Sequence, residues 1–383
     1  MSENRKQGKK ILYVRCAPYV LNFDSYNLQE VGLGGAFCRK GYDFDLVYYS
    51  KENRDQIIEI GENKLTILWK KGLKLLRTGV YPFLLNKRFL NQYDIIIMSE
   101  YGQIMSHLVA ERHQNVYLYN GPYYNLFKIP FVEPIYDKIF CKKINLEMKK
   151  IFCKTQMAKE FIEKKGLTNT VVTGVGLDIA KFDAEKLLLP ETQNLMDKMN
   201  GKRNLLYVGS IISRKNTELI IKTFVDLKKN IKNSDLQLVL VGKGDERYTQ
   251  KCKELIPDAI TEDVVWCPFI KNAQLQYIYK AAYAFLLPSV QEIFGMVLLE
   301  AMYFGIPVVS SHSAGAGTLI RNNENGLIVE KFNTNAWKDA IQKLLENKEY
   351  AQKLGSAAKE TIQKNYMWDS IADKMLEHIN IND

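Results

Sequence analysis

The sequence predicts an α/β protein made of two doubly wound parallel-sheet domains. The chain of 383 residues is longer than one ordinary hydrophobic core can organise, so two domains are expected. Its 46% hydrophobic and 25% charged residues are typical of a soluble globular protein. Short apolar segments of strand length alternate with amphipathic segments of helix length. This alternation is the pattern of parallel sheets covered by helices.

The first half of the chain contains six segments with the apolar composition of buried strands. They are residues 11–14, 44–48, 64–68, 94–98, 116–119 and 151–153, with helices predicted at 27–39 and 157–165. Glycines at 32, 34 and 35 fall inside the first helical pattern, not directly after a strand. They therefore predict close packing of that helix and not a glycine-rich phosphate loop.

The second half restarts the same alternation after a polar stretch at 181–200 that is expected to be a linker. Strands are predicted at 204–208, 236–241, 264–269, 284–287 and 308–310, and segments 318–321 and 325–329 continue the pattern. An amphipathic helix is expected after Lys215, and further helices at 271–282, 338–346 and 350–365. Gly242 and Gly244 follow a predicted buried strand and allow a tight turn at the sheet edge where ligands of α/β proteins bind.

The most informative stretch is 288–317, PSVQEIFGMVLLEAMYFGIPVVSSHSAGAG. It predicts a loop with Glu292, a helix with Glu300, and then a strand. The first helical amides, near Phe294, Gly295 and Met296, lack intrahelical partners and attract a phosphate. The two carboxylates then flank the phosphates and can accept hydrogen bonds from sugar hydroxyls. From the spacing alone, a helix-surface Glu300 and a Glu292 that only complements the helix dipole are equally compatible.

The complete string resembles the signature of retaining, nucleotide-sugar-dependent glycosyltransferases of family 4 (glycosyl transferases group 1), which have the GT-B fold. The matching elements are Pro288-Ser289, Glu292, Phe294-Gly295, Glu300, Ala301-Met302, Gly305 and Pro307-Val308-Val309. The resemblance covers the chain from about residue 170 onward, and it implies two Rossmann-like domains facing a cleft. Residues 1–180 would form the acceptor-side domain, 181–200 the linker and 201–365 the nucleotide-sugar domain. The final segment, 366–383, resembles the family's helix that crosses back to the N-terminal domain.

The resemblance also assigns roles on the donor side. It implies that Glu300 holds the ribose hydroxyls and that Glu292 lies against the transferred sugar. Lys215 matches the family lysine that holds the diphosphate. Ser210 stands where the family usually has arginine, so Arg214 is expected to take that place. Phe269 falls where the nucleotide-base pocket begins, although an aromatic residue is more often part of the core.

The expected chemistry is metal-independent, with Lys215, Arg214 and the helix amides stabilising the departing diphosphate. A UDP-sugar is the expected donor, and no prosthetic group is implied. Family members often carry a histidine after the strand at 116–119, where this chain has Asn120. Asn120, Tyr123 and Glu100 are the acceptor-side candidates, each with a structural loop role as the alternative.

The net charge of +10 lies mainly in the first half, where residues 1–200 hold 30 Lys and Arg against 22 Asp and Glu. Segment 69–89 mixes apolar side chains with six basic ones and no acid. The basic residues are Lys70, Lys71, Lys74, Arg77, Lys87 and Arg88. This mixture predicts contact with an anionic membrane surface. The alternative is an ordinary helix packed on its own domain; a nucleic-acid partner is not supported by any motif.

The function predicted is transfer of a hexose-type sugar, with retention, to a glycan or lipid-linked acceptor in cell-surface polysaccharide or glycoconjugate assembly. Six cysteines without a CxxC pair favour reduced thiols in the cytoplasm. The basic segment 69–89 adds the expectation of peripheral attachment to the inner face of the plasma membrane. Two alternatives remain open. One is another GT-B enzyme, such as a nucleotide-sugar epimerase or a glycan phosphorylase. The other is a non-catalytic, glycosyltransferase-like binding partner.

Overall fold

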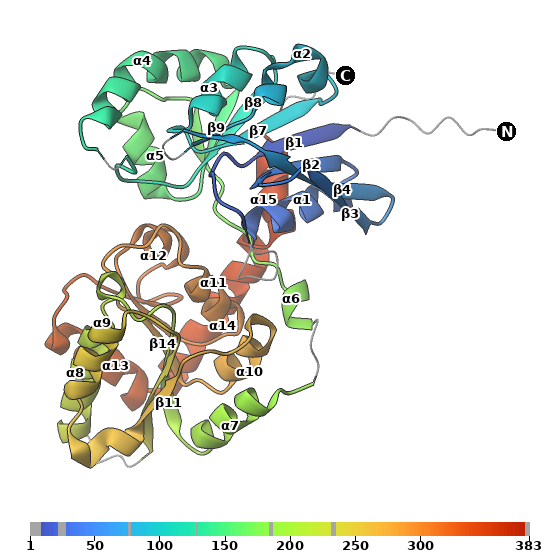
Figure 1. Ribbon diagram of the computed structural model, residues 1–383. Helices are drawn as coiled ribbons and strands as arrows, with labels where there is room; N and C mark the ends of the chain where they lie inside the picture. Colours follow the sequence, from blue (N-terminus) through green and yellow to red (C-terminus); the bar gives the residue numbers. More distant parts are fainter. Residues whose placement is uncertain are drawn as a thin grey trace. The chain divides into compact units, whose positions relative to one another are not determined.

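The computed structural model describes residues 9–21, 28–75, 78–127, 129–183, 187–230 and 235–379. The chain forms two compact units, coloured along the sequence in Figure 1. Unit 1 comprises Met1–Gly176 and Tyr366–Asp383, and unit 2 comprises Leu177–Asn365. The chain therefore returns to unit 1 at its C-terminal end. Both units have the Rossmann-like α/β architecture that the alternation of segments predicts.

Unit 1 is built on an eight-stranded sheet in the order β10-β9-β8-β7-β1-β2-β4-β3. Its strands are β1 (Lys10–Val14), β2 (Asp43–Ser50), β3 (Arg54–Ile60), β4 (Asn63–Lys71), β7 (Ile95–Ser99), β8 (Val116–Asn120), β9 (Lys150–Cys153) and β10 (Thr170–Val172). Only β3 pairs in the antiparallel direction among these strands. The strand order reverses at β1, which has β2 on one side and β7 on the other. Such a switch point opens a crevice at the carboxyl ends of the strands.

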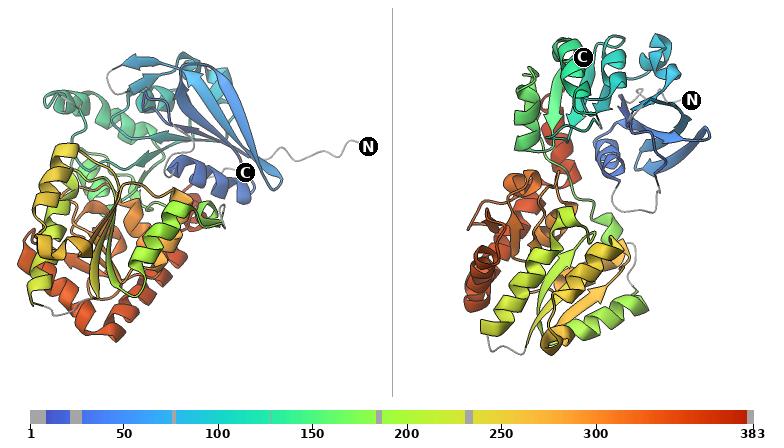
Figure 2. Two further views of the ribbon diagram at one scale, coloured as in Figure 1. Left: turned by 60° about the horizontal axis from the view of Figure 1, so that its bottom comes forward. Right: turned by 60° about the vertical axis from the view of Figure 1, so that its left-hand side comes forward.

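Helices cover both faces of the unit 1 sheet, as the two views of Figure 2 show. They are α1 (Gln29–Arg39), α2 (Lys87–Leu90), α3 (Ile104–Ala110), α4 (Val132–Glu147), α5 (Gln156–Glu163) and α15 (Trp368–Leu376). Strand β3 was not predicted. It is an edge strand whose side chains are mostly exposed, so it lacks the apolar signal of a buried strand.

The glycines of α1 allow close helix packing, which confirms their interpretation from the sequence. A Cβ atom on Gly32 would lie 2.2 Å from Nε1 of Trp368, on α15. A Cβ atom on Gly34 would lie 2.7 Å from the Phe44 ring, on β2. Helix α1 therefore contacts a helix and the sheet at distances that only glycine permits.

We expect Gly32→Ala to lower the free energy of unfolding by about 1–3 kcal/mol, because the added methyl group overpacks against Trp368. Urea denaturation of the full chain measures this. Gly35→Ala is the matched control in the same helix. Its Cβ would meet only Arg39 Nη1 at 3.4 Å and Ile60 Cδ1 at 3.6 Å, so alanine should stabilise the helix by about 0.5–1 kcal/mol. Equal effects of the two substitutions would contradict the packing argument.

Unit 2 is built on a six-stranded, fully parallel sheet in the order β13-β12-β11-β14-β15-β16. Its strands are β11 (Arg203–Val208), β12 (Leu236–Val241), β13 (Val264–Cys267), β14 (Ala284–Leu287), β15 (Val308–Ser311) and β16 (Leu327–Val329). The flanking helices are α6 (Ala180–Asp183), α7 (Pro190–Met199), α8 (Thr217–Asn230), α9 (Glu246–Glu254), α10 (Leu275–Lys280), α11 (Met296–Tyr303), α12 (Ala314–Leu319), α13 (Thr334–Glu346) and α14 (Lys348–Asn365).

The stretch at 181–200, expected as a linker, belongs to unit 2 and contains helix α7. This helix buries Thr192, Leu195 and Met199 and packs with α10. The spacing of its three buried residues forms one narrow helical stripe. Its remaining side chains are polar, which is why the composition resembles that of a linker.

The basic segment 69–89 is not one continuous surface layer. It contains the end of β4, a small hairpin of β5 (Leu73–Leu75) with β6 (Thr78–Val80), a 3-10 turn at Pro82–Leu85 and α2. Trp69, Tyr81 and Leu84 are buried in the core. Lys70 forms an ion pair with Asp55 at 2.8 Å, and Arg77 lies outside the described residues. Leu73, Lys74 and Leu75 of the hairpin are exposed. The segment therefore combines core residues with an exposed basic hairpin, as strands and turns instead of the single helix that was the alternative.

Two further observations concern solvent and membrane. Within the described ranges, no helix combines the length and the apolar character needed to cross a bilayer. All six cysteines are free thiols, and five of them are buried. Burial raises the pKa of Cys252 to about 11 and that of Cys153 to about 12. These thiols are therefore un-ionised packing residues at neutral pH.

Candidate functional site

The donor-side candidates gather along one edge of the unit 2 sheet. The loop from Gly209 to Lys215 follows β11, Gly242 follows β12, Phe269 follows β13, and the loop 288–295 follows β14. Because these strands are parallel, their carboxyl ends lie at the same edge, where doubly wound sheets bind ligands. The topology thus brings together residues that are up to 86 positions apart in the sequence.

Two glycines let the first loops of this edge touch through their backbones. A Cβ atom on Gly242 would lie 2.0 Å from the carbonyl oxygen of Gly209, and one on Gly244 would lie 1.7 Å from that of Ile211. The Ile211 amide donates a 3.0 Å hydrogen bond to the Lys243 carbonyl. No side chain fits between these two loops, so main-chain groups line the site where the loops meet.

Lys215 and Glu292 form an ion pair that joins the loop after β11 to the loop after β14. Both side chains are mostly buried, with 13% and 14% of their surfaces exposed. Two further hydrogen bonds connect the same loops, one from a side chain and one between backbones. Arg214 donates from Nη1 to the Gln291 carbonyl at 2.7 Å, and the Val290 amide donates to the Arg214 carbonyl at 2.9 Å. The structure thus places two cations and Glu292 in one cluster.

Helix α11 starts beside this cluster. Gly295 precedes it with φ +79°, a left-handed conformation that favours glycine. No side chain caps the helix, so its first amides remain available to an anion. Phe294 is buried, and a Cβ atom on Gly315 of α12 would lie 1.6 Å from the Phe294 carbonyl oxygen. Close packing with α12 therefore fixes the turn before Met296.

Glu300 is fully buried on α11. Its Oε1 pairs with Nζ of Lys181 at 2.7 Å, and its Oε2 accepts a 2.9 Å hydrogen bond from the Tyr279 hydroxyl. Lys181 comes from the short helix α6, and the Tyr279 ring stacks on Phe304 with centroids 5.6 Å apart. Lys181 therefore neutralises a carboxylate that is buried from solvent. Sequence reasoning missed Lys181 and Tyr279, because nothing local in the sequence marks them.

Phe269 and Ser210 lie at the surface of the same edge. The Phe269 side chain is 61% exposed, so it is not a core residue, and its ring is free to stack on a planar ligand. Ser210 is exposed, and its carbonyl accepts a 2.8 Å hydrogen bond from the Tyr207 hydroxyl. Ser210 lacks the charge that the family's arginine would supply, and Arg214 is the nearest basic residue in the loop.

Unit 1 carries a second polar cluster at the carboxyl ends of its strands, which the sequence did not reveal. Arg15 follows β1 and pairs through Nε with Glu30 at 3.3 Å, while its Nη1 is buried and has no partner among the described residues. Lys154 follows β9, donates to Gln29 at 2.8 Å and lies 4.8 Å from the Tyr119 ring centroid. Burial lowers the pKa of Lys154. A buried cation with a shifted pKa at a switch point is a typical ligand-binding feature.

The three acceptor-side candidates from the sequence have different environments. Asn120 is fully buried, accepts from the Tyr101 amide at 3.3 Å and donates to the Pro122 carbonyl at 3.2 Å. The side-chain amide of Asn120 therefore connects the loop at Tyr101 with the loop at Pro122 through hydrogen bonds. Tyr123 is partly buried against the unit 1 core and contacts Tyr124 edge to face. Glu100 has φ +60°, a strained conformation for this residue type that is concentrated at functional sites.

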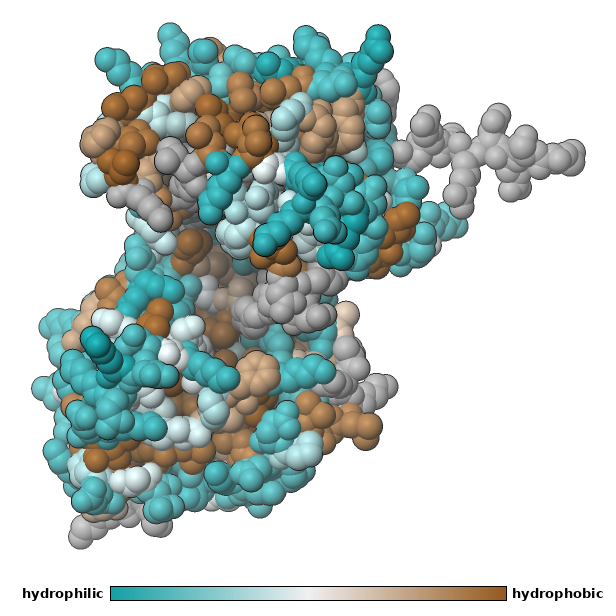
Figure 3. Space-filling model, in the orientation of Figure 1, coloured by the Kyte–Doolittle hydropathy of each residue, from teal (hydrophilic) through white to brown (hydrophobic). Residues whose placement is uncertain are grey.

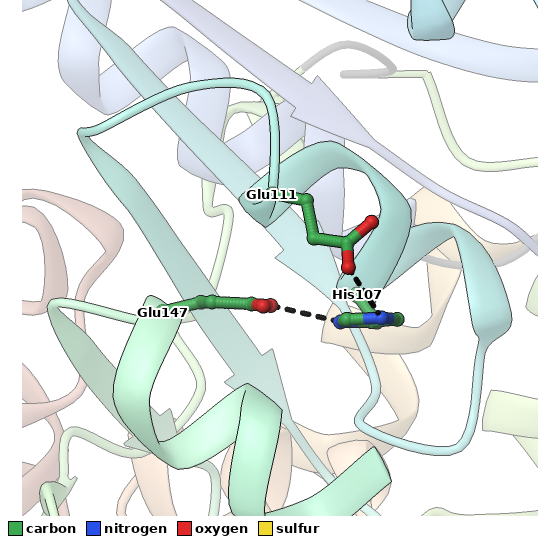
Figure 4. Close-up of side chains that lie close together, drawn as sticks. All are labelled: His107, Glu111 and Glu147. Atoms are coloured by element: carbon green, nitrogen blue, oxygen red, sulfur yellow. Dashed lines mark hydrogen bonds and ion pairs between the residues drawn. The ribbon is translucent and has the colours of Figure 1, made fainter. Parts of the chain in front are cut away.

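His107 is the centre of the one group of described residues that could hold a metal ion. Glu147 of α4 contacts its Nδ1 at 2.8 Å, and Glu111 contacts its Nε2 at 3.2 Å. Figure 4 shows one carboxylate contacting each of the two ring nitrogens. Both ring nitrogens are engaged by these carboxylates within the fold itself. The arrangement is that of a buried histidine that ties α3 to α4.

Two Rossmann-like units, with basic side chains and uncapped helix amides at the sheet edge of the second, define an α/β protein of the GT-B type. Residues 192–361 match the family model described as "Glycosyl transferases group 1". The chain is 29% identical over 203 residues to the D-inositol 3-phosphate glycosyltransferase of Pseudarthrobacter chlorophenolicus, covering 53% of this chain and 48% of that protein. The chain spans about half the length of the first curated relatives that it matches.

Solved structures show the same fold over nearly the whole chain. The sucrose-phosphate synthase of Thermosynechococcus elongatus has a TM-score of 0.72 at 18% identity, with 96% of this chain and 98% of that chain covered. An E. coli structure described as trehalose-6-phosphate bound with UDP-2-fluoro glucose has a TM-score of 0.72 at 13% identity, with 97% and 99% covered. These similarities confirm the GT-B fold of two Rossmann-like domains.

Proposed function

We propose that this chain is a retaining glycosyltransferase of family 4, moving a hexose-type sugar from a nucleotide-diphosphate donor to a glycan or lipid-linked acceptor. The observation that carries the proposal is the cluster of Lys215, Arg214 and Glu292 beside the uncapped start of α11. A departing diphosphate needs positive charge and oriented N–H groups where negative charge develops. This cluster supplies both without recourse to a metal ion.

On the donor side, the diphosphate is held by Lys215, Arg214 and the amides after Gly295. Main-chain groups around Gly242 line the diphosphate site. Glu292 positions the transferred sugar, because its carboxylate lies beside Lys215 at the helix start. Phe269 stacks on the base, and Glu300 accepts the ribose hydroxyls once Lys181 withdraws. UDP is the proposed nucleotide, since a structural neighbour of the chain binds a UDP-sugar.

On the acceptor side, unit 1 supplies the switch-point cluster. Arg15 and Lys154 provide positive charge there, and Glu30 and Glu100 provide carboxylates. A phosphorylated acceptor would neutralise the unpaired Nη1 of Arg15 and the partly desolvated Lys154. We place the reaction in the cytoplasm, at the inner face of the membrane, in cell-surface polysaccharide or glycoconjugate assembly.

Thermal melting with UDP-, GDP-, ADP-, CMP- and dTDP-linked sugars tests the donor site. We expect one nucleotide series to raise the melting temperature, since ligand at about 100 times its Kd adds about 2.7 kcal/mol of stability. Lys215→Ala and Glu300→Ala should each reduce the rise, measured against the melting temperature of the same variant without ligand. A wild-type chain that responds to none of these donors would overturn the enzyme proposal and favour the non-catalytic binding partner.

A further inference from the structure

Helix α4 of unit 1 carries an apolar stripe on the side that faces solvent. Four large hydrophobic side chains are exposed on the helix and at its start: Phe131 (66%), Ile135 (54%), Ile139 (50%) and Leu146 (76%). At about 100° per residue they fall within an arc of about 80°. The buried residues of the helix, Tyr136, Cys141 and Ile144, lie on the opposite side. Figure 3 shows hydrophobic surface where Figure 1 places α4.

The exposed charged residues of α4 itself are all positive. Lys138, Lys142 and Lys143 are exposed on α4, and none of them pairs with a described residue. By the same helical geometry, Lys142 lies within the apolar arc and the other two lysines lie on either side of it. Long lysine side chains in such positions can extend their ammonium groups beyond an apolar contact surface.

The acids of α4 are held by other partners. Glu133 contacts Lys165 at 3.4 Å and accepts a 3.0 Å hydrogen bond from the Tyr101 hydroxyl. Asp137 also pairs with Lys165, and Glu147 pairs with His107 at 2.8 Å. All three carboxylates are partly buried. The helix therefore presents apolar groups and positive charge outward, without compensating negative charge.

We propose that the stripe formed by Phe131, Ile135, Ile139 and Leu146, with the three lysines beside it, docks unit 1 on an anionic lipid bilayer. Exposed apolar side chains enter the boundary between headgroups and acyl chains, and lysines bind the anionic headgroups. A second copy of this chain fits less well, because a two-fold contact through the stripe would bring lysines against lysines. The proposal places the main membrane contact on α4, which exposes more apolar side chains than segment 69–89 with its Leu73 and Leu75. It rests on the proposed function only in making the acceptor lipid-borne.

Vesicle sedimentation of the full chain tests this proposal. The probes are vesicles of phosphatidylcholine alone and of phosphatidylcholine mixed with phosphatidylglycerol, at low and high salt. We expect binding only to the anionic vesicles, weakened by salt. The triple substitution Lys138→Glu, Lys142→Glu, Lys143→Glu should reduce the partition coefficient about a hundredfold. A second triple substitution, Ile135→Gln, Ile139→Gln, Leu146→Gln, should reduce the partition coefficient about tenfold or more. Glutamine is chosen because it preserves helix propensity.

The matched control reverses three exposed lysines of segment 69–89: Lys71→Glu, Lys74→Glu, Lys87→Glu. It changes the net charge of unit 1 by the same amount as the α4 substitution and should retain most of the binding. Wild-type protein that ignores anionic vesicles, α4 variants that bind like wild type, or equal losses in the control would each overturn the proposal. Melting shifts with nucleotide, measured without vesicles, report the donor site separately and also show that each variant is folded.

Discussion

Replacing Lys215 with alanine is expected to lower kcat/KM for sugar transfer about a hundredfold to a thousandfold, the usual effect of removing one group that stabilises a developing oxyanion. The ammonium group of Lys215 is mostly buried and lies against Glu292 at the start of α11. Its charge is therefore poorly screened by water and acts strongly on a departing diphosphate. Release of the nucleoside diphosphate from the donor that raises the melting temperature provides the assay.

Two further variants separate a direct role from a structural one. Lys215→Ala leaves the Glu292 carboxylate without its partner, so a loss of activity could reflect that unpaired charge alone. The double variant Lys215→Ala, Glu292→Gln removes the unpaired charge. If Lys215 acts on the diphosphate, the double variant is much less active than Glu292→Gln alone, whereas equal activity of these two variants would show that Lys215 only neutralises Glu292. Lys229→Ala, at a lysine that is 67% exposed on α8, controls for the loss of a positive charge.

Lys181→Met is expected to have the largest effect on stability, lowering the free energy of unfolding by about 3–5 kcal/mol. The substitution removes the Lys181 ammonium group from Glu300, which is fully buried, and keeps the hydrogen bond from the Tyr279 hydroxyl. Loss of one partner from a buried ion pair leaves an uncompensated charge in the interior. Urea denaturation without nucleotide measures this change. Lys280→Met is the control, since Lys280 is exposed near the same Phe304 ring and should change stability by less than about 0.5 kcal/mol.

The same variant should bind the donor differently. In the wild-type chain Lys181 occupies the carboxylate that we assign to the ribose, so the nucleotide competes with it. In Lys181→Met the melting rise produced by the nucleotide should therefore be larger than in the wild type. A rise that shrinks instead would mean that Lys181 contributes to donor binding, and unchanged stability would argue against the buried pair.

Much of this architecture follows from local sequence patterns. Buried parallel strands are continuous apolar runs, as in LQLVLV of β12 and AFLL of β14, and such runs are recognisable without knowing what they pack against. The structure of positions 288–309 can also be predicted locally, because a loop, a helix start and a strand follow one another within one short segment. The glycines of α1 were interpreted correctly for the same reason, since their place inside a helical pattern is a local property.

The remaining features depend on residues far apart in the sequence. Lys181 reaches Glu300 across 119 positions, and Lys154 reaches Gln29 across 125, so neither contact leaves a periodic signal. Segment 69–89 and α4 both contain apolar and basic residues, and composition cannot tell which apolar side chains are buried. Tertiary packing buries Trp69, Tyr81 and Leu84 but leaves Ile135, Ile139 and Leu146 exposed. The sequence by itself determined the fold class and the donor-site loops, because these depend on local periodicity. Only the tertiary structure decided which charges are paired and which apolar side chains are exposed to solvent, because burial depends on every element that packs around a residue.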